Sequence, residues 1–382
     1  MKHDVQRDLI HRVFDYADRR TTTLAPESFL EDVAAYTDPS RLARERLRLF
    51  RGEPLLLAFS GQLAAAGDWL SHDLSGLPIL LVRGADGRVR AFANACRHRG
   101  APVAKGCGRS ARVFTCPYHG WSWDTEGRLT GLPFAEGFAD LPEERRRLVS
   151  LPVAERHGLV LVRPSPGGAL DADAWLGPLG PELGDFGYAR HVPYAVRSLE
   201  CRLNWKLAID TFLESYHVPV LHKDSVGPIF VGNLAPYDAF GRHGRLVAVR
   251  RKLLALRERP ESEWDLIPNS GLLYLLFPNS ILIQQADHVE LWQAWPAGDE
   301  PGRSHVTLSF LIPEPPANAA ATRHWEANLE LAVRTVTQED FPLGESIQRG
   351  FESAAQPRVV FGRNEPGLIH YHRNLREAVA RA

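Results

Sequence analysis

Four side chains that are able to bind a metal lie between residues 94 and 123. Cys96 and His98 form a C-x-H motif, and after seventeen intervening residues Cys116 and His119 form C-x-x-H. Two sites take two cysteines and two histidines. One is a tetrahedral structural zinc, and the other is a [2Fe–2S] cluster with two Cys on one iron and two His on the other. Ligand type alone leaves both sites open.

The distribution of these ligands over two short stretches favours the iron–sulfur cluster. Zinc fingers usually pair Cys with Cys and His with His within each stretch. Here each stretch supplies one of each, so each loop is able to reach both irons. At this point the chain resembles the Rieske family, whose motif is present as C-R-H from Cys96 and C-P-Y-H-G-W from Cys116.

The residues around the motif indicate which kind of Rieske centre to expect. Respiratory Rieske proteins resemble this loop, but they carry a serine where Trp121 stands and extra loop cysteines where Ala101 and Tyr118 stand. Fewer hydrogen-bond donors to the sulfurs favour a lower reduction potential. We therefore expect a low-potential electron donor of the oxygenase type. Cys107 is off position for a loop disulfide, and we expect it to be structural.

A second constellation lies in N-W-K-L-A-I-D-T-F-L-E-S-Y-H-V-P-V-L-H, which ends at His222. If this stretch is helical, Asp210, Glu214 and His217 recur at i, i+4 and i+7 and share one face. Two histidines and one carboxylate would form the facial triad of non-haem Fe(II) oxygenases, which leaves coordination positions open for O₂. The alternative is a polar helix face with a capping histidine.

Taken together, the two motifs resemble the α (large, terminal oxygenase) subunits of Rieske non-haem iron aromatic-ring-hydroxylating oxygenases, over essentially the whole chain. The resemblance implies that His217 and His222 bind iron. It also implies that Glu214 is the acid linking an iron-ligand histidine to a Rieske histidine of a neighbouring subunit. Most members carry Asp there, and Glu is similar to the carnitine oxygenase subgroup. Asp210 is a further candidate catalytic residue.

The same resemblance places the third iron ligand far downstream, in V-T-Q-E-D-F-P-L-G-E-S-I-Q-R-G, residues 336–350. We expect Asp340 to be this ligand, with Glu339 and Glu345 as alternatives. A solvated or helix-capping role is the competing interpretation of Asp340.

The cofactors implied by the resemblance are one Rieske [2Fe–2S] cluster and one mononuclear Fe(II), with O₂ as co-substrate. The chain has no G-x-G-x-x-G after a strand and no C-x₄-C-x₂-C, so it lacks a nucleotide or ferredoxin motif of its own. We therefore expect a separate NAD(P)H-dependent reductase, with or without a ferredoxin, as partner. The family likeness also implies a homotrimer, with or without a small β subunit.

Apolar residues near the expected iron ligands favour an aromatic or other apolar small-molecule substrate, as in aromatic hydrocarbon catabolism. We expect Phe212, Leu213 and Val218, together with strands at 270–295, to line the pocket. The reaction would be a hydroxylation, by either monooxygenase or dioxygenase chemistry.

Three other interpretations remain open. The first is demethylation or hydroxylation of a quaternary amine of the carnitine or betaine kind, for which Trp292, Trp295 and Tyr274 would form an aromatic cage. The second is a Rieske electron carrier without chemistry of its own. The third is a zinc-stabilised binding module.

The elements that must position these residues predict an α+β chain. Residues 5–50 show helical apolar spacing. From residue 54 short β-type runs follow, with hairpins turned at Asp86-Gly87 and near Gly127. Beyond a Pro/Gly-rich boundary, strands are expected in 245–310 and a long helix over 320–337.

These elements suggest three parts. We expect residues 1–53 to be an N-terminal helical segment of the catalytic domain, and 54–164 to be an all-β Rieske domain. We expect 165–382 to be the rest of a helix-grip-like catalytic domain with an antiparallel sheet, in which or next to which the Rieske domain is inserted.

Bulk composition excludes several classes of protein. The 382 residues carry a formal net charge of −1, so no global field attracts nucleic acid or an anionic membrane. No apolar run reaches the roughly 18–20 residues of a membrane helix. The start, M-K-H-D-V-Q-R-D-L-I, shows no apolar signal-peptide region, and we expect a cytoplasmic protein. Four cysteines in this length do not make a disulfide scaffold.

Overall fold

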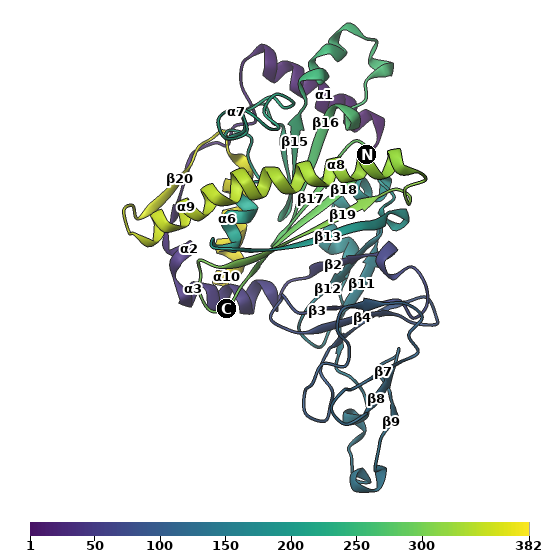
Figure 1. Cartoon of the computed structure of the whole chain (residues 1–382). Helices are drawn as coiled ribbons and strands as arrows, with labels where there is room; N and C mark the ends of the chain where they lie inside the picture. Colours follow the sequence, from purple (N-terminus) through teal and green to yellow (C-terminus); the bar gives the residue numbers. More distant parts are fainter. Residues whose placement is uncertain (382) are drawn as a thin grey trace. The chain divides into compact units, whose positions relative to one another are not determined.

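The computed structural model describes residues 1–381, and the chain divides into two units (Figure 1). The smaller unit comprises Arg46–Leu176 and Gly187–Arg190. The larger unit comprises Met1–Glu45, Gly177–Phe186 and His191–Ala382. The predicted α+β class, with a β-rich unit interrupting an α+β unit, is confirmed. The predicted domain boundaries at 53/54 and 164/165 stay predictions.

The smaller unit is built from antiparallel sheets with the orders β10-β5-β4-β3-β6, β11-β12-β2 and β7-β8-β9. Its strands are β2 (Leu55–Phe59), β3 (Trp69–His72), β4 (Ile79–Arg83), β5 (Val89–Ala93), β6 (Cys107–Gly108), β7 (Val113–Thr115), β8 (Ser122–Asp124), β9 (Leu129–Gly131), β10 (Ser150–Leu151), β11 (Val153–Arg156) and β12 (Leu159–Val162). Its helical turns are η1 (Arg46–Phe50), η2 (Ser60–Leu63), η3 (Ala135–Phe138), η4 (Glu143–Arg146), α4 (Ala172–Leu176) and η5 (Tyr188–Arg190).

Both predicted hairpins of the smaller unit are present. The β4–β5 hairpin turns at Asp86-Gly87 and the β8–β9 hairpin turns at Gly127, with φ of 77° and 75° at the two glycines. Such positive φ values are the reason that glycine is favoured at these turns.

The larger unit is organised around a seven-stranded antiparallel sheet of order β13-β19-β18-β17-β16-β15-β14. Its strands are β13 (Val192–Cys201), β14 (Tyr237–Phe240), β15 (His243–Val249), β16 (Ser270–Leu276), β17 (Ser280–Gln284), β18 (Val289–Pro296) and β19 (Ser304–Ile312). A separate two-stranded pairing joins β1 (Phe29–Asp32) to β20 (Arg358–Phe361). The apolar runs predicted over 245–310 therefore form the central strands, most of which are buried.

The larger unit also contains helices and helical turns, and in Figure 1 the long helix α8 runs across the strands of the sheet. They are α1 (His3–Asp18), α2 (Ala34–Thr37), α3 (Pro39–Glu45), α5 (Leu179–Asp185), α6 (Trp205–Asp210), α7 (Val218–Leu221), η6 (Arg251–Glu258), η7 (Glu261–Glu263), η8 (Ile267–Asn269), α8 (Ala319–Thr335), η9 (Val336–Asp340), α9 (Phe341–Glu352) and α10 (Pro366–Ala380). The helix predicted at 320–337 is α8. Asn318 caps it by accepting hydrogen bonds from two backbone N–H groups.

The prediction of one helix through His217 is wrong, because α6 ends at Asp210. The N–H groups of Phe212 and Leu213 bond three residues back, at 3.1 and 3.0 Å, which tightens and ends the helix. The carboxylate of Glu214 then accepts the backbone N–H groups of Tyr216 and His217. This local bonding competes with helix continuation, so Asp210, Glu214 and His217 do not share a helix face.

Within residues 1–381, no helix combines the length and the apolar character that crossing a membrane requires.

Candidate active site

Two loops of the smaller unit carry the Cys/His motif, and they fold alike. The N–H of Gly100 donates to the carbonyl of Cys96 at 2.9 Å, and the N–H of Gly120 donates to that of Cys116 at 3.0 Å. The N–H of each cysteine donates in turn to the residue after that glycine, at 2.8 Å in both loops. Gly100 and Gly120 have φ of 81° and 74°, which a residue with a Cβ adopts at a cost. Each loop is therefore a tight turn closed by its own backbone hydrogen bonds.

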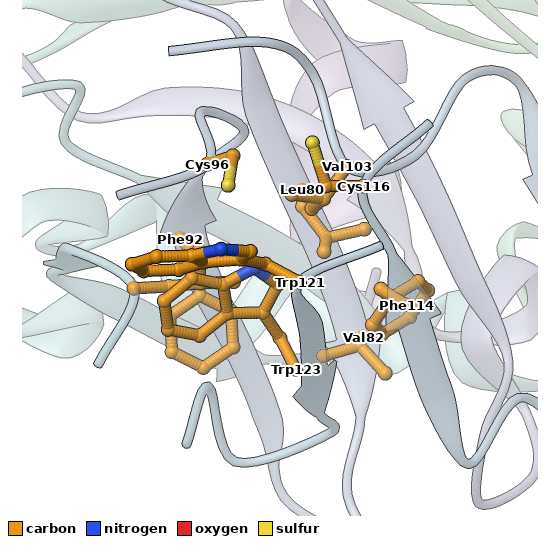
Figure 2. Packing of buried hydrophobic residues seen from close by; sticks show 10 residues of the cluster. Leu80, Val82, Phe92, Cys96, Val103, Phe114, Cys116, Trp121 and Trp123 are labelled. Atoms are coloured by element: carbon orange, nitrogen blue, oxygen red, sulfur yellow. The ribbon is translucent and has the colours of Figure 1, made fainter. Parts of the chain in front are cut away.

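Both cysteines are buried in one apolar cluster. Figure 2 shows Cys96 and Cys116 at one side of this cluster, near the ring of Trp121, with Trp123 and Val82 farther from the two sulfurs. The N–H groups in the loops and this apolar packing hold the sulfurs without a disulfide, since all four cysteines of the chain are free. Cys107 lies exposed in β6, outside the pair of loops.

His98 is arranged as a metal ligand would be. Its ring stacks on Trp121 at 5.0 Å and 7°, and its centroid lies 4.7 Å from that of His119. Its Nδ1 is buried, with no hydrogen-bond partner among the described residues. Burial, aided by the nearby His119, lowers the pKa of His98, which favours the neutral ring that metals bind. A buried nitrogen without a partner is costly and fits ligation.

The four donors in these loops do not gather around one point. Within residues 1–381, one group of three or more His, Cys, Asp or Glu has all its ligand atoms within 4.8 Å of one another, and it lies elsewhere in the chain. A single zinc needs four converging donors, whereas a [2Fe–2S] group holds its Cys and His pairs on different irons. The residues therefore fit the cluster.

The group that does converge consists of His217, His222 and Asp340 in the larger unit. The Nε2 atoms of the two histidines lie 3.1 Å apart. Asp340 Oδ1 lies 3.1 Å from His222 Nε2 and 3.7 Å from His217 Nε2. Bonds of about 2.1 Å at right angles place neighbouring ligand atoms about 3 Å apart. The three atoms thus form one face around a single ion, which matches a facial triad.

Three short elements bring these ligands together. His217 and His222 lie at the two ends of α7, and Asp340 ends the π-helical turn η9, just before α9. Asp340 and His222 are buried, with side chains 5% and 4% exposed, whereas His217 is 23% exposed. The triad is therefore more open to solvent at His217 than at the other two ligands.

A carboxylate holds each ligand histidine through its other nitrogen. Glu214 pairs with Nδ1 of His217, and Glu339 Oε2 lies 2.5 Å from Nδ1 of His222. Ser225 also donates to Glu339, at 2.7 Å. Carboxylate partners of this kind fix the tautomer, so that the Nε2 lone pair faces the metal.

The expected alternatives to Asp340 take other positions. Glu339 faces His222 Nδ1 from outside the triad, so it supports a ligand, a role that the sequence did not reveal. Glu345 is no alternative, because its carboxylate accepts the backbone N–H of Arg202 at 3.0 Å. The sequence did contain a signal for this arrangement, namely two adjacent acids, of which Asp340 is the expected ligand and Glu339 supports His222.

The N-W-K motif anchors the ligand-bearing segment. Asn204 caps α6, and its backbone N–H donates to Gln348 of α9 at 3.1 Å. The Trp205 indole N–H and the Lys206 ammonium both donate to Glu45, at 2.8–2.9 Å. Lys206 and Glu45 are 1% and 0% exposed, so this is a fully buried ion pair. It fixes the start of the segment that leads to His217.

Asp210 lies in a buried polar network. Its two oxygens accept from Tyr36 at 2.8 Å and approach His372 Nε2 at 2.8 Å. Burial, with the adjacent Asp210 charge, raises the pKa of Tyr36 well above its ordinary value. These contacts bind the end of α6 to α2 and α10.

A mostly apolar cavity of about 280 Å³ opens beside the triad, between the sheet and α8. Phe212 and Val218 line it as expected, and so do residues of β16, β17 and β18. Leu213 does not line it; the residue is buried, and its backbone lies next to Gly367.

The predicted aromatic cage is not formed. Trp292 lines the cavity, whereas Tyr274 and Trp295 do not. Successive residues of a strand face opposite sides of the sheet. Leu273 faces the cavity, so Tyr274 faces the other side, where its hydroxyl donates to Glu182 at 2.6 Å.

Comparison with known families agrees with this geometry. Residues 189–381 match the family described as ring hydroxylating alpha subunit (catalytic domain), and residues 53–143 match the Rieske [2Fe-2S] domain.

Three curated relatives illustrate the range of similarity. The chain is 32% identical over 194 residues to the carnitine monooxygenase oxygenase subunit of Escherichia coli (strain K12). This match covers 49% of this chain and 50% of that protein. It is 25% identical over 387 residues to the chloroplastic choline monooxygenase of Beta vulgaris, covering 98% and 81%. It is 34% identical over 166 residues to the biphenyl 2,3-dioxygenase subunit alpha of Rhodococcus jostii (strain RHA1), covering 43% and 34%.

Solved structures show the same fold. A quaternary ammonium Rieske monooxygenase superposes with a TM-score of 0.80 at 18% identity, over 92% of this chain and 96% of that one. Naphthalene 1,2-dioxygenase from Rhodococcus sp. superposes with a TM-score of 0.74 at 20% identity, over 98% of both chains.

Proposed function

The chain belongs to the ring-hydroxylating alpha-subunit family of Rieske oxygenases, and on that premise we propose that it is the terminal oxygenase of a multicomponent system. It would take electrons from a separate reductase and use O₂ to hydroxylate an aromatic or other apolar small molecule. The observation that carries this proposal is the triad of His217, His222 and Asp340 at the wall of a mostly apolar cavity.

The cofactors are a Rieske [2Fe–2S] cluster and a mononuclear iron. We assign Cys96 and Cys116 to one iron of the cluster and His98 and His119 to the other. When bound, these groups supply one-electron transfer and the activation of O₂.

His217, His222 and Asp340 would hold the mononuclear iron. Glu214 and Glu339 retain the Nδ1 protons of the two histidines, so that each Nε2 is free to bind the metal.

The cavity residues would place the substrate and exclude water. Phe212 and Trp292, with ring centroids 5.6 Å apart, offer a flat apolar wall. Val218 follows the ligand His217 directly, so the wall continues to the triad. Apolar contact orients a substrate, and exclusion of water strengthens every polar contact in the site.

The partners that we propose are an NAD(P)H-dependent reductase, with or without a ferredoxin, and two further copies of this chain. Glu214 would then also bridge to a Rieske histidine of a neighbouring subunit. Support comes from Tyr216, which precedes the ligand His217, and from Val220, which lies between the two ligand histidines. They are 60% and 78% exposed, as residues covered by another subunit would be. A small β subunit and a cytoplasmic location stay predictions.

A quaternary amine is the second candidate substrate. It is favoured by glutamate at position 214 and by the similarity to the carnitine and choline monooxygenases. The cavity offers one of the three expected cage aromatics, Trp292, so we rank an apolar or aromatic body ahead.

Metal content and one substitution test the proposed function. We expect about three irons and two acid-labile sulfides per chain, whereas an electron carrier would hold about two irons. His217→Ala should lose the mononuclear iron, keep the Rieske spectrum and abolish O₂-dependent product formation with a surrogate reductase. His305→Ala, near the start of β19, half-buried and outside the cavity, is the matched control. Oxygenated product from His217→Ala would overturn the assignment.

A further inference from the structure

The cavity beside the triad contains an arginine that the proposed chemistry does not use. Arg250 follows β15 and contributes to the cavity wall. Its guanidinium lies 5.8 Å from the ring centroid of Phe230, and its Nη2 donates to the side-chain oxygen of Gln285 at 2.9 Å. Its Nε is buried, with no hydrogen-bond partner in the part of the chain that the structure describes.

Such an arginine is costly unless something pairs with it. A guanidinium stays charged at all ordinary pH values, so it cannot relieve its burial by losing a proton. Burial lowers the pKa of Arg250, and the more distant charges of Asp287 and Glu290 offset only part of that effect. The neutral amide of Gln285 satisfies one of its donors and supplies no opposite charge.

The other charged groups in this region already have partners. Glu290 accepts from the indole of Trp292 at 2.9 Å and lies 3.4 Å from His288. His288 also pairs with Asp287 at 2.8 Å. Within residues 1–381, no carboxylate forms an ion pair with Arg250, whose hydrogen bond goes to an amide. Gln285 links the guanidinium to Glu290, since its Nε2 donates to that carboxylate at 3.1 Å. The guanidinium therefore faces the cavity without a carboxylate in direct contact among the described residues.

A second polar atom in the same cavity lacks a partner. The hydroxyl of Thr335, at the end of α8, is buried with the residue 9% exposed, and it has no hydrogen-bond partner among the described residues. A pure hydrocarbon would leave this hydroxyl and the Nε of Arg250 without hydrogen-bond partners, which is unfavourable for buried polar groups. A quaternary ammonium without an acid group would in addition meet the positive charge of Arg250.

Building on the proposed function, we propose that the substrate is an organic acid, with an aromatic or other apolar body and a carboxylate that binds to Arg250. The planar fork of the guanidinium matches the two oxygens of a carboxylate. The apolar wall of Phe212, Val218 and Trp292 takes the body of the molecule, and the triad lies on the same cavity wall. Arg250 is therefore the specificity-determining residue of this site.

Binding to the intact holoenzyme tests the proposal. The probes are benzoate, phenylacetate, 3-phenylpropionate and cinnamate, each compared with its neutral amide, and choline as a cation. Isothermal titration calorimetry gives the Kd of each probe. At least one carboxylate should bind about 10- to 100-fold more tightly than its amide, because a charge-assisted hydrogen bond outweighs a neutral one.

Three variants make the result specific. Arg250→Gln should remove the preference for the carboxylate, and Arg250→Lys, which keeps the charge but not the fork, should retain part of it. Arg323→Gln removes an exposed arginine from α8 and should change nothing. Unchanged Rieske absorption and iron content show that each variant is folded, and Arg250→Lys serves if Arg250→Gln does not fold.

The outcomes separate this inference from the proposed function. If every amide, or choline, binds as tightly as the carboxylates, or if the preference survives Arg250→Gln, the proposal is overturned. Carboxylate binding that depends on Arg250 supports it, even if no oxygenated product forms, in which case the proposed function fails instead. Oxygenated product from neutral compounds, without any preference for an acid, would support the proposed oxygenase function and overturn the proposal of an acidic substrate.

Discussion

Replacing Glu339 with glutamine would test how the iron-binding histidines are held. Glu339 Oε2 lies 2.5 Å from His222 Nδ1 and accepts a second hydrogen bond from Ser225 at 2.7 Å. Glutamine keeps the shape of the side chain and removes its charge. If the amide NH₂ turns toward Nδ1, the histidine proton moves to Nε2 and blocks the ligand atom. Both effects weaken metal binding and leave the fold in place.

The expected size of this effect follows from carboxylate partners of ligand histidines. Loss of such a partner typically lowers metal affinity about 10- to 100-fold, which corresponds to about 1.4–2.7 kcal/mol. A suitable assay is anaerobic titration with Co(II) of protein that has a loaded cluster and an emptied mononuclear site. The absorption of bound Co(II) reports occupancy directly, without turnover.

Glu345→Gln is the matched control, since Glu345 lies in the same acidic stretch and touches neither histidine. Its carboxylate accepts the N–H of Arg202 at 3.0 Å, and an amide oxygen preserves that bond. We expect its Co(II) affinity to stay within about twofold of the unsubstituted protein. The reasoning fails if Glu339→Gln binds Co(II) normally, or if Glu345→Gln loses as much affinity.

Three further predictions concern stability. Lys206→Met leaves the buried carboxylate of Glu45 with Arg41, 2.9 Å away, in place of two cations, and should cost up to about 3 kcal/mol in urea unfolding. Lys206→Met/Glu45→Leu should recover part of that loss. Burial lowers the pKa of His72 to about 4. Between pH 6.5 and 4 the imidazole is therefore protonated in the unfolded state and neutral in the folded state. As the pH falls through this range, the free energy of unfolding of the smaller unit should decrease by up to about 3 kcal/mol. A thermal midpoint that falls over this range, with a shallower slope in His72→Gln, supports this, and a flat profile refutes it. Gly120→Ala, at φ 74°, should cost about 1–2 kcal/mol and lower cluster content, whereas Gly137→Ala, with open space around it, should do neither.

The cluster loops were predictable from the sequence because everything they need is local. Cys96 and His119 are the ends of a 24-residue stretch, and the glycines that close both loops stand next to the ligands or two positions after them. The hairpins at Gly87 and Gly127 were predictable for the same reason, since turn residues act within a few positions.

The surroundings of the iron triad depended on features that helical spacing does not show. The helix ends at Asp210, and Glu214 then binds the N–H groups of Tyr216 and His217, which competes with further helix. No periodicity records that competition. The π-helical turn at 336–340 carries both Glu339 and Asp340, which meet His222 at its two different ring nitrogens. Nothing in the helical spacing of the sequence indicates that turn.

The cage aromatics illustrate a signal that was present in the sequence. Trp292 and Trp295 are three residues apart on one strand, so side-chain alternation alone places them on opposite faces. The contact of Tyr274 with Glu182 comes from residues 92 positions apart and could not be inferred from local pattern.

The order of the two units along the chain has a consequence for biosynthesis. All segments of the smaller unit have been synthesised once Arg190 is added, and its four ligands lie close together in sequence. The larger unit joins its first 45 residues to residues beyond 191, and Asp340 follows His217 by more than a hundred positions. Segments made first tend to fold first, and distant contacts close late. A nascent chain would thus complete the fold around its iron–sulfur ligands before its mononuclear site exists.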